Sequence, residues 1–139
     1  MKNLLWVSLF FLALAAPRAM YGVVDPCTTA KSSTPFSINT GGGQQVIAGV
    51  SAKQIYVCNI VFSGSAAQGF NITFAGNSAS CSSGFTSLFG SFYANNNAVV
   101  STGGGGSTQF TVPFSDNFCI ELGGTSPLQS SGWIVYVQR

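Results

Sequence analysis

Ile55-Tyr56-Val57-Cys58-Asn59-Ile60-Val61-Phe62 is the stretch that decides the fold class. Apolar residues occupy both alternating sets of positions in it, so an extended chain with this sequence would be apolar on both sides. The run is short, rich in β-branched and aromatic residues, and followed by a cluster of small turn-forming residues. It therefore predicts a central strand that is covered on both faces.

Similar short apolar runs recur on either side of this stretch, and clusters of Gly, Ser and Asn separate them. No run keeps a helical apolar period for three turns. Regular short strands with turn signals between them are typical of two-sheet β proteins. The sequence therefore predicts an all-β fold, an antiparallel β-sandwich of jelly-roll or immunoglobulin-like type with about seven to nine strands.

Strand alternation predicts which side chains are buried, because successive side chains point to opposite faces. In the run 117–122 the apolar residues at even positions are expected inside, while Cys119 and Glu121 are expected outside. In the run 70–74, Asn71 and Thr73 are expected to face solvent. In the last strand, Trp133 shares one side with Val135 and Val137.

The first 19 residues are predicted to be a signal peptide. Lys2 gives a positive start, the run 4–16 is apolar, and Ala13-Leu14-Ala15 has the small-x-small form of a cleavage site. The apolar run is shorter than the about 20 residues that span a bilayer, so an uncleaved anchor is the weaker alternative. We expect a lead segment at 20–34 and the β-sandwich domain at 35–139, secreted and found outside the cell or on a particle surface.

Charge is scarce in this chain. Of its five basic residues, Lys2 and Arg18 lie in the predicted leader, which leaves three bases against three acids. Nucleic-acid binding needs several basic groups on one face, so no nucleic-acid partner is expected. A neutral surface does not repel its own copies, which favours a homo-oligomer or polymer, or a neutral glycan ligand. No membrane association is expected once the leader is removed.

Four cysteines, an even number, predict disulfides in an exported chain. Cys119 points away from the core and needs a partner in a loop, which Cys81 can supply. Cys27 lies in the lead segment, which the central strand could hold through Cys58. We therefore predict the pairs Cys27–Cys58 and Cys81–Cys119.

Catalytic and metal-binding groups are sparse. There is no histidine, and no C-x-x-C spacing, so neither a zinc site nor a histidine-activated nucleophile is expected. Asp116 and Glu121 would face opposite ways on a regular strand, which makes them a poor glycosidase pair. The sequence predicts no enzyme, no metal and no cofactor.

Several residues are candidates for contact with a ligand or another subunit. Aromatic and amide side chains crowd the region before residue 97, where sugar stacking or a subunit contact would use Phe92, Tyr93 and Asn95, with Trp133 near the end of the chain. The alternative is that these aromatics belong to the core. The segment 34–40, with Phe36 and Ile38, could be an edge strand or be donated to a neighbouring copy. Asn71-Ile72-Thr73 matches the N-glycosylation pattern. The alternative is an ordinary strand triplet that matches this pattern by chance.

A recognisable order of short segments runs along the chain: Asp25-Pro26-Cys27, Lys31 to Phe36, Ile55-Tyr56-Val57-Cys58, the Cys81 turn, Phe118-Cys119-Ile120 and Gly132 to Gln138. In this order the chain resembles a group of small Gly/Ser/Thr-rich, disulfide-containing β-sandwich structural proteins of uncultured phages and environmental sequences. The resemblance covers nearly all of the region after the leader and implies a virion or surface structural role. It supplies no catalytic residues. The leader is a departure that favours an exported protein over a virion assembled in the cytoplasm.

The expected function is therefore a non-enzymatic structural subunit of an extracellular filament, surface layer or virion surface that assembles through β-strand contacts. The alternative is a carbohydrate-binding module or adhesin.

Overall fold

The computed structural model describes residues 24–39, 41–65, 70–77, 81–82, 86–95, 97–104, 106–124 and 129–139. The predicted signal peptide lies outside these residues. The described residues form one short 3-10 helix and nine strands, namely η1 (Pro26–Thr28), β1 (Ser32–Ile38), β2 (Gly42–Ile47), β3 (Ile55–Ser65), β4 (Phe70–Asn77), β5 (Thr86–Ala94), β6 (Val99–Ser101), β7 (Phe110–Val112), β8 (Asn117–Gly124) and β9 (Gln129–Gln138). The first strand begins at Ser32, ahead of the predicted domain start at 35.

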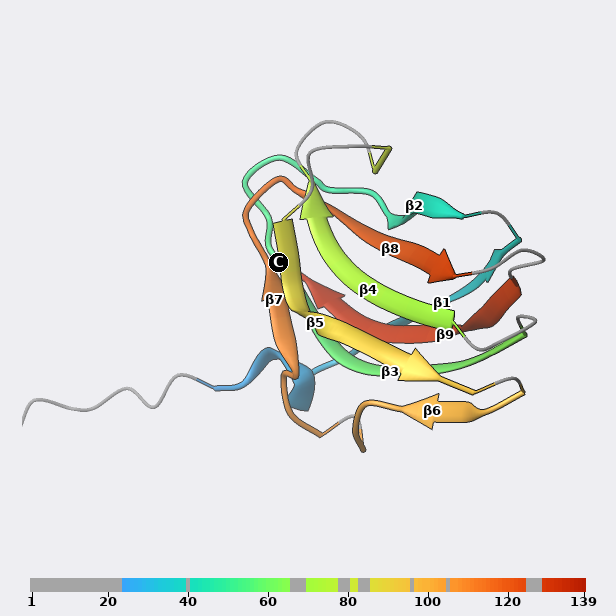
Figure 1. Cartoon of the computed structure of the whole chain (residues 1–139). Coiled ribbons are helices and arrows are strands. Elements are labelled where there is room, and N and C mark those ends of the chain that lie inside the picture. The colour runs from blue at the N-terminus through green and yellow to red at the C-terminus, as the bar shows by residue number, and fades with distance from the viewer. Residues whose placement is uncertain are drawn as a thin grey trace, which may run out of the picture.

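The strands form two antiparallel sheets that pack face to face (Figure 1). Sheet A has the order β1-β9-β3-β6, and sheet B has the order β2-β8-β4-β5. β7 also pairs with β3, at Ile55–Val57, while β6 pairs with it at Val61–Ser63, so β6 and β7 are two parts of one interrupted strand. The predicted β-sandwich is confirmed.

The strand order decides between the two predicted topologies. With β6 and β7 counted together, the chain changes sheet at every step except the step from β4 to β5, which are neighbours in sheet B. This is the double Greek-key order of a jelly roll. An immunoglobulin-like sandwich would instead place its first two strands side by side in one sheet. Here β1 lies beside β9, and β2 lies in the other sheet beside β8. The fold is a jelly roll.

The core between the sheets is built around aromatic rings. Phe62 of sheet A meets Phe74 of sheet B edge to face, with ring centroids 5.9 Å apart. Phe74 also stacks on Phe110 and on Phe118. The inward residues predicted for β8 and for Ile72 and Phe74 are buried, as alternation required.

A β-bulge at Cys58 explains why the central stretch is apolar on both sides. Val57 lies opposite Tyr136, but Asn59 lies opposite Val135, so Cys58 is an extra residue in β3. Inward positions are therefore odd-numbered before the bulge and even-numbered after it. The prediction that both faces of β3 are covered holds only near Cys58, because Val61 and Ser63 beyond it are partly exposed on the outer face.

Both predicted disulfides are present, and each lies on an outer face. Cys27–Cys58 holds η1 against sheet A, where the two cysteines form a buried cluster with Val137. Cys81–Cys119 holds a turn against sheet B, next to Ala75. Two disulfides indicate an oxidising, extracellular setting.

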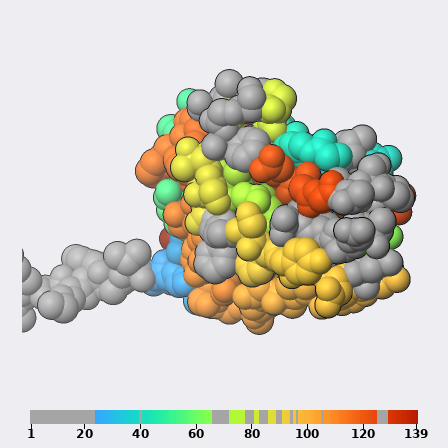
Figure 2. All heavy atoms as spheres, viewed as in Figure 1, coloured from blue at the N-terminus to red at the C-terminus, as the bar shows by residue number. Residues whose placement is uncertain are grey.

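Asp25 ties the N-terminal segment to the loop before β7. Its carboxylate caps η1 by accepting a hydrogen bond from the Cys27 amide at 2.8 Å. It also accepts hydrogen bonds from the Thr108 hydroxyl at 2.6 Å and from the Thr108 amide at 2.9 Å. In Figure 2 the blue atoms of this segment lie against orange atoms, the colour of the region of the chain that contains β6 and β7. The hydrogen bonds from Thr108, first from its hydroxyl and then from its amide, hold the pKa of Asp25 below its ordinary value of 3.8.

We expect this carboxylate to make folding stability depend on acid pH. Because its folded-state pKa is depressed, the stability it contributes is present above 3.8 and is lost as the pH falls through the lower folded-state value. Asp25→Asn keeps a capping side chain but removes the charge. Its free energy of unfolding, measured in urea, should therefore fall less than that of the wild type between neutral pH and pH about 3. Thr108→Val should have a similar but smaller effect, and parallel pH profiles for Asp25→Asn and wild type would contradict the assignment.

Candidate functional site

The outer face of sheet A is only half covered. The segment η1 and its disulfide cover the half that contains Tyr56, Val135 and Val137. The other half lies over the N-terminal part of β9. It is a groove made of two adjoining hollows of about 420 and 510 Å³. The hollows share Ser63, Val99 and Ser131, so they are continuous.

The strand register arranges the side chains of the groove in rungs. Alternate residues of a strand share a face, so each rung of the outer face is two residues from the next, a spacing of about 7 Å along the strands. One rung is apolar and joins Pro35, Trp133 and Val61 across β1, β9 and β3.

The next rung carries hydroxyl groups. It joins Ser37, Ser131 and Ser63 across the same three strands, and Val99 of β6 continues it. The side chain of Val99 is 73% exposed. This rung supplies all three residues that the two hollows share.

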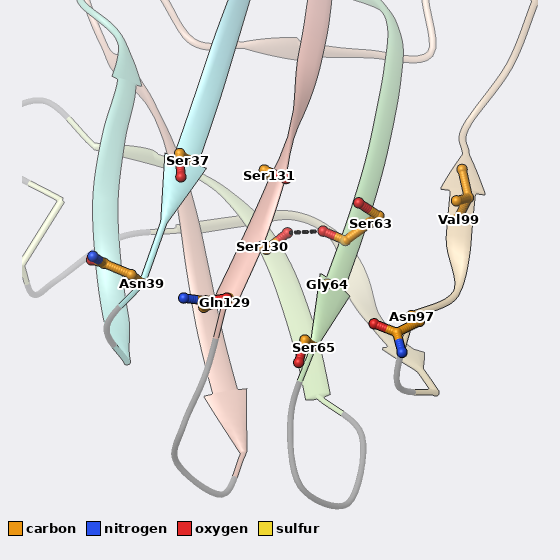
Figure 3. Close-up of a pocket in the computed structure, with 10 residues that line it drawn as sticks. All are labelled: Ser37, Asn39, Ser63, Gly64, Ser65, Asn97, Val99, Gln129, Ser130 and Ser131. Carbon is orange, nitrogen blue, oxygen red and sulfur yellow. Dashed lines mark hydrogen bonds between the residues drawn. The ribbon is translucent and has the colours of Figure 1, made fainter.

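The last rung lies at the end of the sandwich and carries amide side chains. Gln129 pairs with Ser65. At the same end, Asn39 follows β1 and Asn97 precedes β6 (Figure 3). Each of these four residues borders a different connection, namely β8–β9, β3–β4, β1–β2 and β5–β6. The jelly-roll topology brings these four connections to one end, and so gathers polar residues that are far apart in sequence.

Two local features hold this end in place. Asn97 has a positive φ of 61°, a conformation that Asn tolerates better than most residues. Its backbone N–H donates a hydrogen bond to the Gly64 carbonyl at 2.8 Å. The buried Ser130 hydroxyl donates to the Ser63 carbonyl at 3.1 Å, shown in Figure 3. The hydroxyl of Ser130 is therefore already engaged inside the sheet, while Ser37, Ser131 and Gln129 are exposed in the groove.

Trp133 is the main apolar surface of the groove. Its side chain is 49% exposed, in the rung between Pro35 and Val61. None of the described residues that line either hollow carries a charge. The groove therefore offers a flat aromatic surface at one end and neutral hydrogen-bonding groups at the other.

The predicted contact residues do not form one site. Phe36 and Ile38 are buried in the core, and β1, which contains them, lies at the end of sheet A. A contact between this strand and a neighbouring copy stays a prediction. Phe36 also borders the apolar hollow. Phe92 packs against Phe74, with ring centroids 5.7 Å apart, as the alternative core interpretation expected. Tyr93 is 65% exposed, but on the outer face of sheet B, with Asn95 in the turn that follows.

Of the predicted contact residues with exposed side chains, Trp133 alone lies in the groove. Asn71 belongs to β4, but its side chain lies outside the described part of the structure. The amide residues of the groove were missed at the sequence level. Asn39, Asn97 and Gln129 stand beside clusters of small residues, where polar side chains are expected as part of turns. Their common position depends on the strand order, which the sequence does not show.

Comparisons with known proteins leave the family open. A scan against protein-family models finds no match, and a search of curated proteins finds none either. The resemblance to structural proteins of phages and environmental sequences therefore stays a prediction.

Two further observations concern the described residues. No helix among them is long and apolar enough to cross a membrane. Within the same part of the chain, no group of three or more His, Cys, Asp or Glu side chains is placed to hold a metal ion.

Proposed function

We propose that the chain is an exported, non-enzymatic carbohydrate-binding protein, and that its ligand occupies the groove on the outer face of sheet A. The observation that carries this proposal is the combination of a half-exposed Trp133 with hydroxyl and amide groups, and no charge, among the described residues of the lining. A sugar ring has one face of C–H groups that can stack on an aromatic ring, and a rim of hydroxyls that need neutral hydrogen-bonding partners. Jelly rolls include lectins as well as capsid subunits, which is an analogy of fold only.

Replacing Trp133 with Ala should strongly weaken this binding. We expect wild-type protein to bind a subset of neutral glycans on an array, and its tryptophan emission to shift on binding. Trp133 is the single tryptophan outside the predicted leader, so the signal reports on the groove. Calorimetry should show that the affinity of Trp133→Ala for these glycans is at least about tenfold weaker than that of the wild type.

Tyr93→Ala is the matched control, because it removes an exposed aromatic side chain from the opposite face of the sandwich. It should leave affinity unchanged. The proposal fails if no neutral glycan binds to the wild type, or if Tyr93→Ala weakens binding as much as Trp133→Ala does.

A structural subunit that assembles through strand pairing is the second candidate, and β1 is the observation that favours it. β1 lies at the end of sheet A and, among the described strands, pairs with β9 alone. It contains no charged residue, and its seven-residue register with β9 is regular. Edge strands with these properties can accept a strand from another copy. Pro35, however, lies at its centre, and a proline removes one backbone donor and protects an edge.

Pro35→Thr should therefore promote self-association if β1 is an assembly edge. Thr restores the missing backbone donor and favours the extended conformation. Light scattering after size exclusion should show larger species for the variant than for the wild type. Ser33→Thr, two residues away on the same strand, is the control. A wild type that remains monomeric, together with a variant that does the same, would exclude assembly through this edge.

A further inference from the structure

The groove is longer than a single sugar ring. Its apolar rung, at Trp133, is separated from its amide rung, at Gln129, by four residues of one strand, which corresponds to about 13 Å. Each hollow by itself is within the range of about 300–1,000 Å³ that small-molecule sites occupy. A pyranose ring stacked on Trp133 cannot also reach Gln129, Asn39 and Asn97.

The two ends also differ in chemistry. The hollow of about 510 Å³ contains Pro35, Val61 and Trp133, whereas the hollow of about 420 Å³ contains three serines, two asparagines and Gln129 besides the residues the two share. An apolar surface suits the stacked face of one sugar unit. Amide groups, which both donate and accept hydrogen bonds, suit the hydroxyl rim of another.

We propose that the ligand is an uncharged oligosaccharide of at least two units that lies along β9, with one unit stacked on Trp133 and another held by Gln129 and Asn39. This inference rests on the proposed function and adds the size, direction and charge of the ligand. Uronate or sulfate groups are disfavoured, because an anion placed in the groove would lose hydration without gaining a cationic partner among the described lining residues.

Chain length is the first test. We measure the affinity of the wild type for one, two, three and four units of each neutral oligosaccharide series that the array identifies. Affinity should rise by at least about tenfold from one unit to three and then level off, as the second end of the groove is filled. A flat series would overturn the inference but leave carbohydrate binding intact. If no neutral sugar of any length binds, the proposed function itself fails.

The amide end is tested by the double variant Gln129→Ala and Asn39→Ala. Both side chains are exposed, and a thermal melt confirms that the fold is kept. The variant should lose the gain of about tenfold for longer chains, so that its affinity for three units falls to its own affinity for one unit. Gln45→Ala, which removes an exposed amide from sheet B, is the matched control and should keep the gain. An unchanged length dependence in the double variant would refute the assigned direction.

Charge is tested with uronate or sulfated oligosaccharides of the same linkage and length as the neutral ligand. They should bind at least about tenfold more weakly, and the affinity for the neutral ligand should not change between low and high salt. Preference for the anionic form, or strong salt dependence, would overturn the inference.

Discussion

Replacing Cys27 and Cys58 together with Ala should lower the free energy of unfolding by about 4 kcal/mol, as the chain-entropy relation gives for a loop of this length. The two cysteines are separated by 31 positions and are fully buried. A typical domain has a total stability of about 5–15 kcal/mol, so the loss is a large share. Urea unfolding at neutral pH measures it.

The matched comparison is the pair Cys81 and Cys119, which is separated by 38 positions and should cost a similar amount in loop entropy. The local consequences should differ. Loss of Cys27–Cys58 releases η1 from sheet A and exposes Val137, so limited proteolysis should cut near residues 24–31 in this variant alone. Equal stability of both variants and the wild type would show that neither disulfide constrains the unfolded chain.

Gly132→Ala should destabilise the protein by about 1–3 kcal/mol or more, because it forces an extra atom into a packed site. Gly132 of β9 lies between Phe36 of β1 and Phe62 of β3. A Cβ atom there would overlap the carbonyl oxygen of Val61 and lie 2.8 Å from the Cα of Phe62. Both are backbone atoms, so no side chain can rotate away, and β9 would have to move from β3. The variant should also lose ligand binding, because Gly132 precedes Trp133.

Gly104→Ala is the control for this substitution. A Cβ at Gly104 would meet no atom within 4 Å, so its effect on stability should be within about 0.5 kcal/mol. Thermal unfolding followed by circular dichroism measures both variants. A melting temperature for Gly132→Ala equal to that of Gly104→Ala would show that the two strands can separate at low cost.

The fold class and both disulfides could be predicted because they depend on local patterns. Cys119 alternates with Phe118 and Ile120, and this alternation alone places the cysteine on the outer face of its strand. The bulge at Cys58 could not be predicted, since an apolar run on both sides of a strand looks the same with or without a shift in register. The expected coverage of both faces of β3 was therefore too broad.

The candidate site could be predicted only in part. Trp133 was identified by its type and its strand face, but it was grouped with Phe92 and Tyr93, which are close to each other in sequence. The strand order places Trp133 on sheet A and Tyr93 on the opposite face, with Phe92 in the core. Adjacent residues of a strand point to opposite faces, so a cluster in sequence does not predict a cluster on a surface.

The sequence by itself determined the all-β class, the two disulfide pairs and the scarcity of charged residues. These properties follow from residue type, count and alternation, which are local quantities. Only the tertiary structure decided the jelly-roll order, and with it the meeting of Asn39, Ser65, Asn97 and Gln129 at one end of sheet A. The physical reason is that pairing between distant strands depends on the joint packing of two sheets around one core, and no single segment of the chain specifies that arrangement.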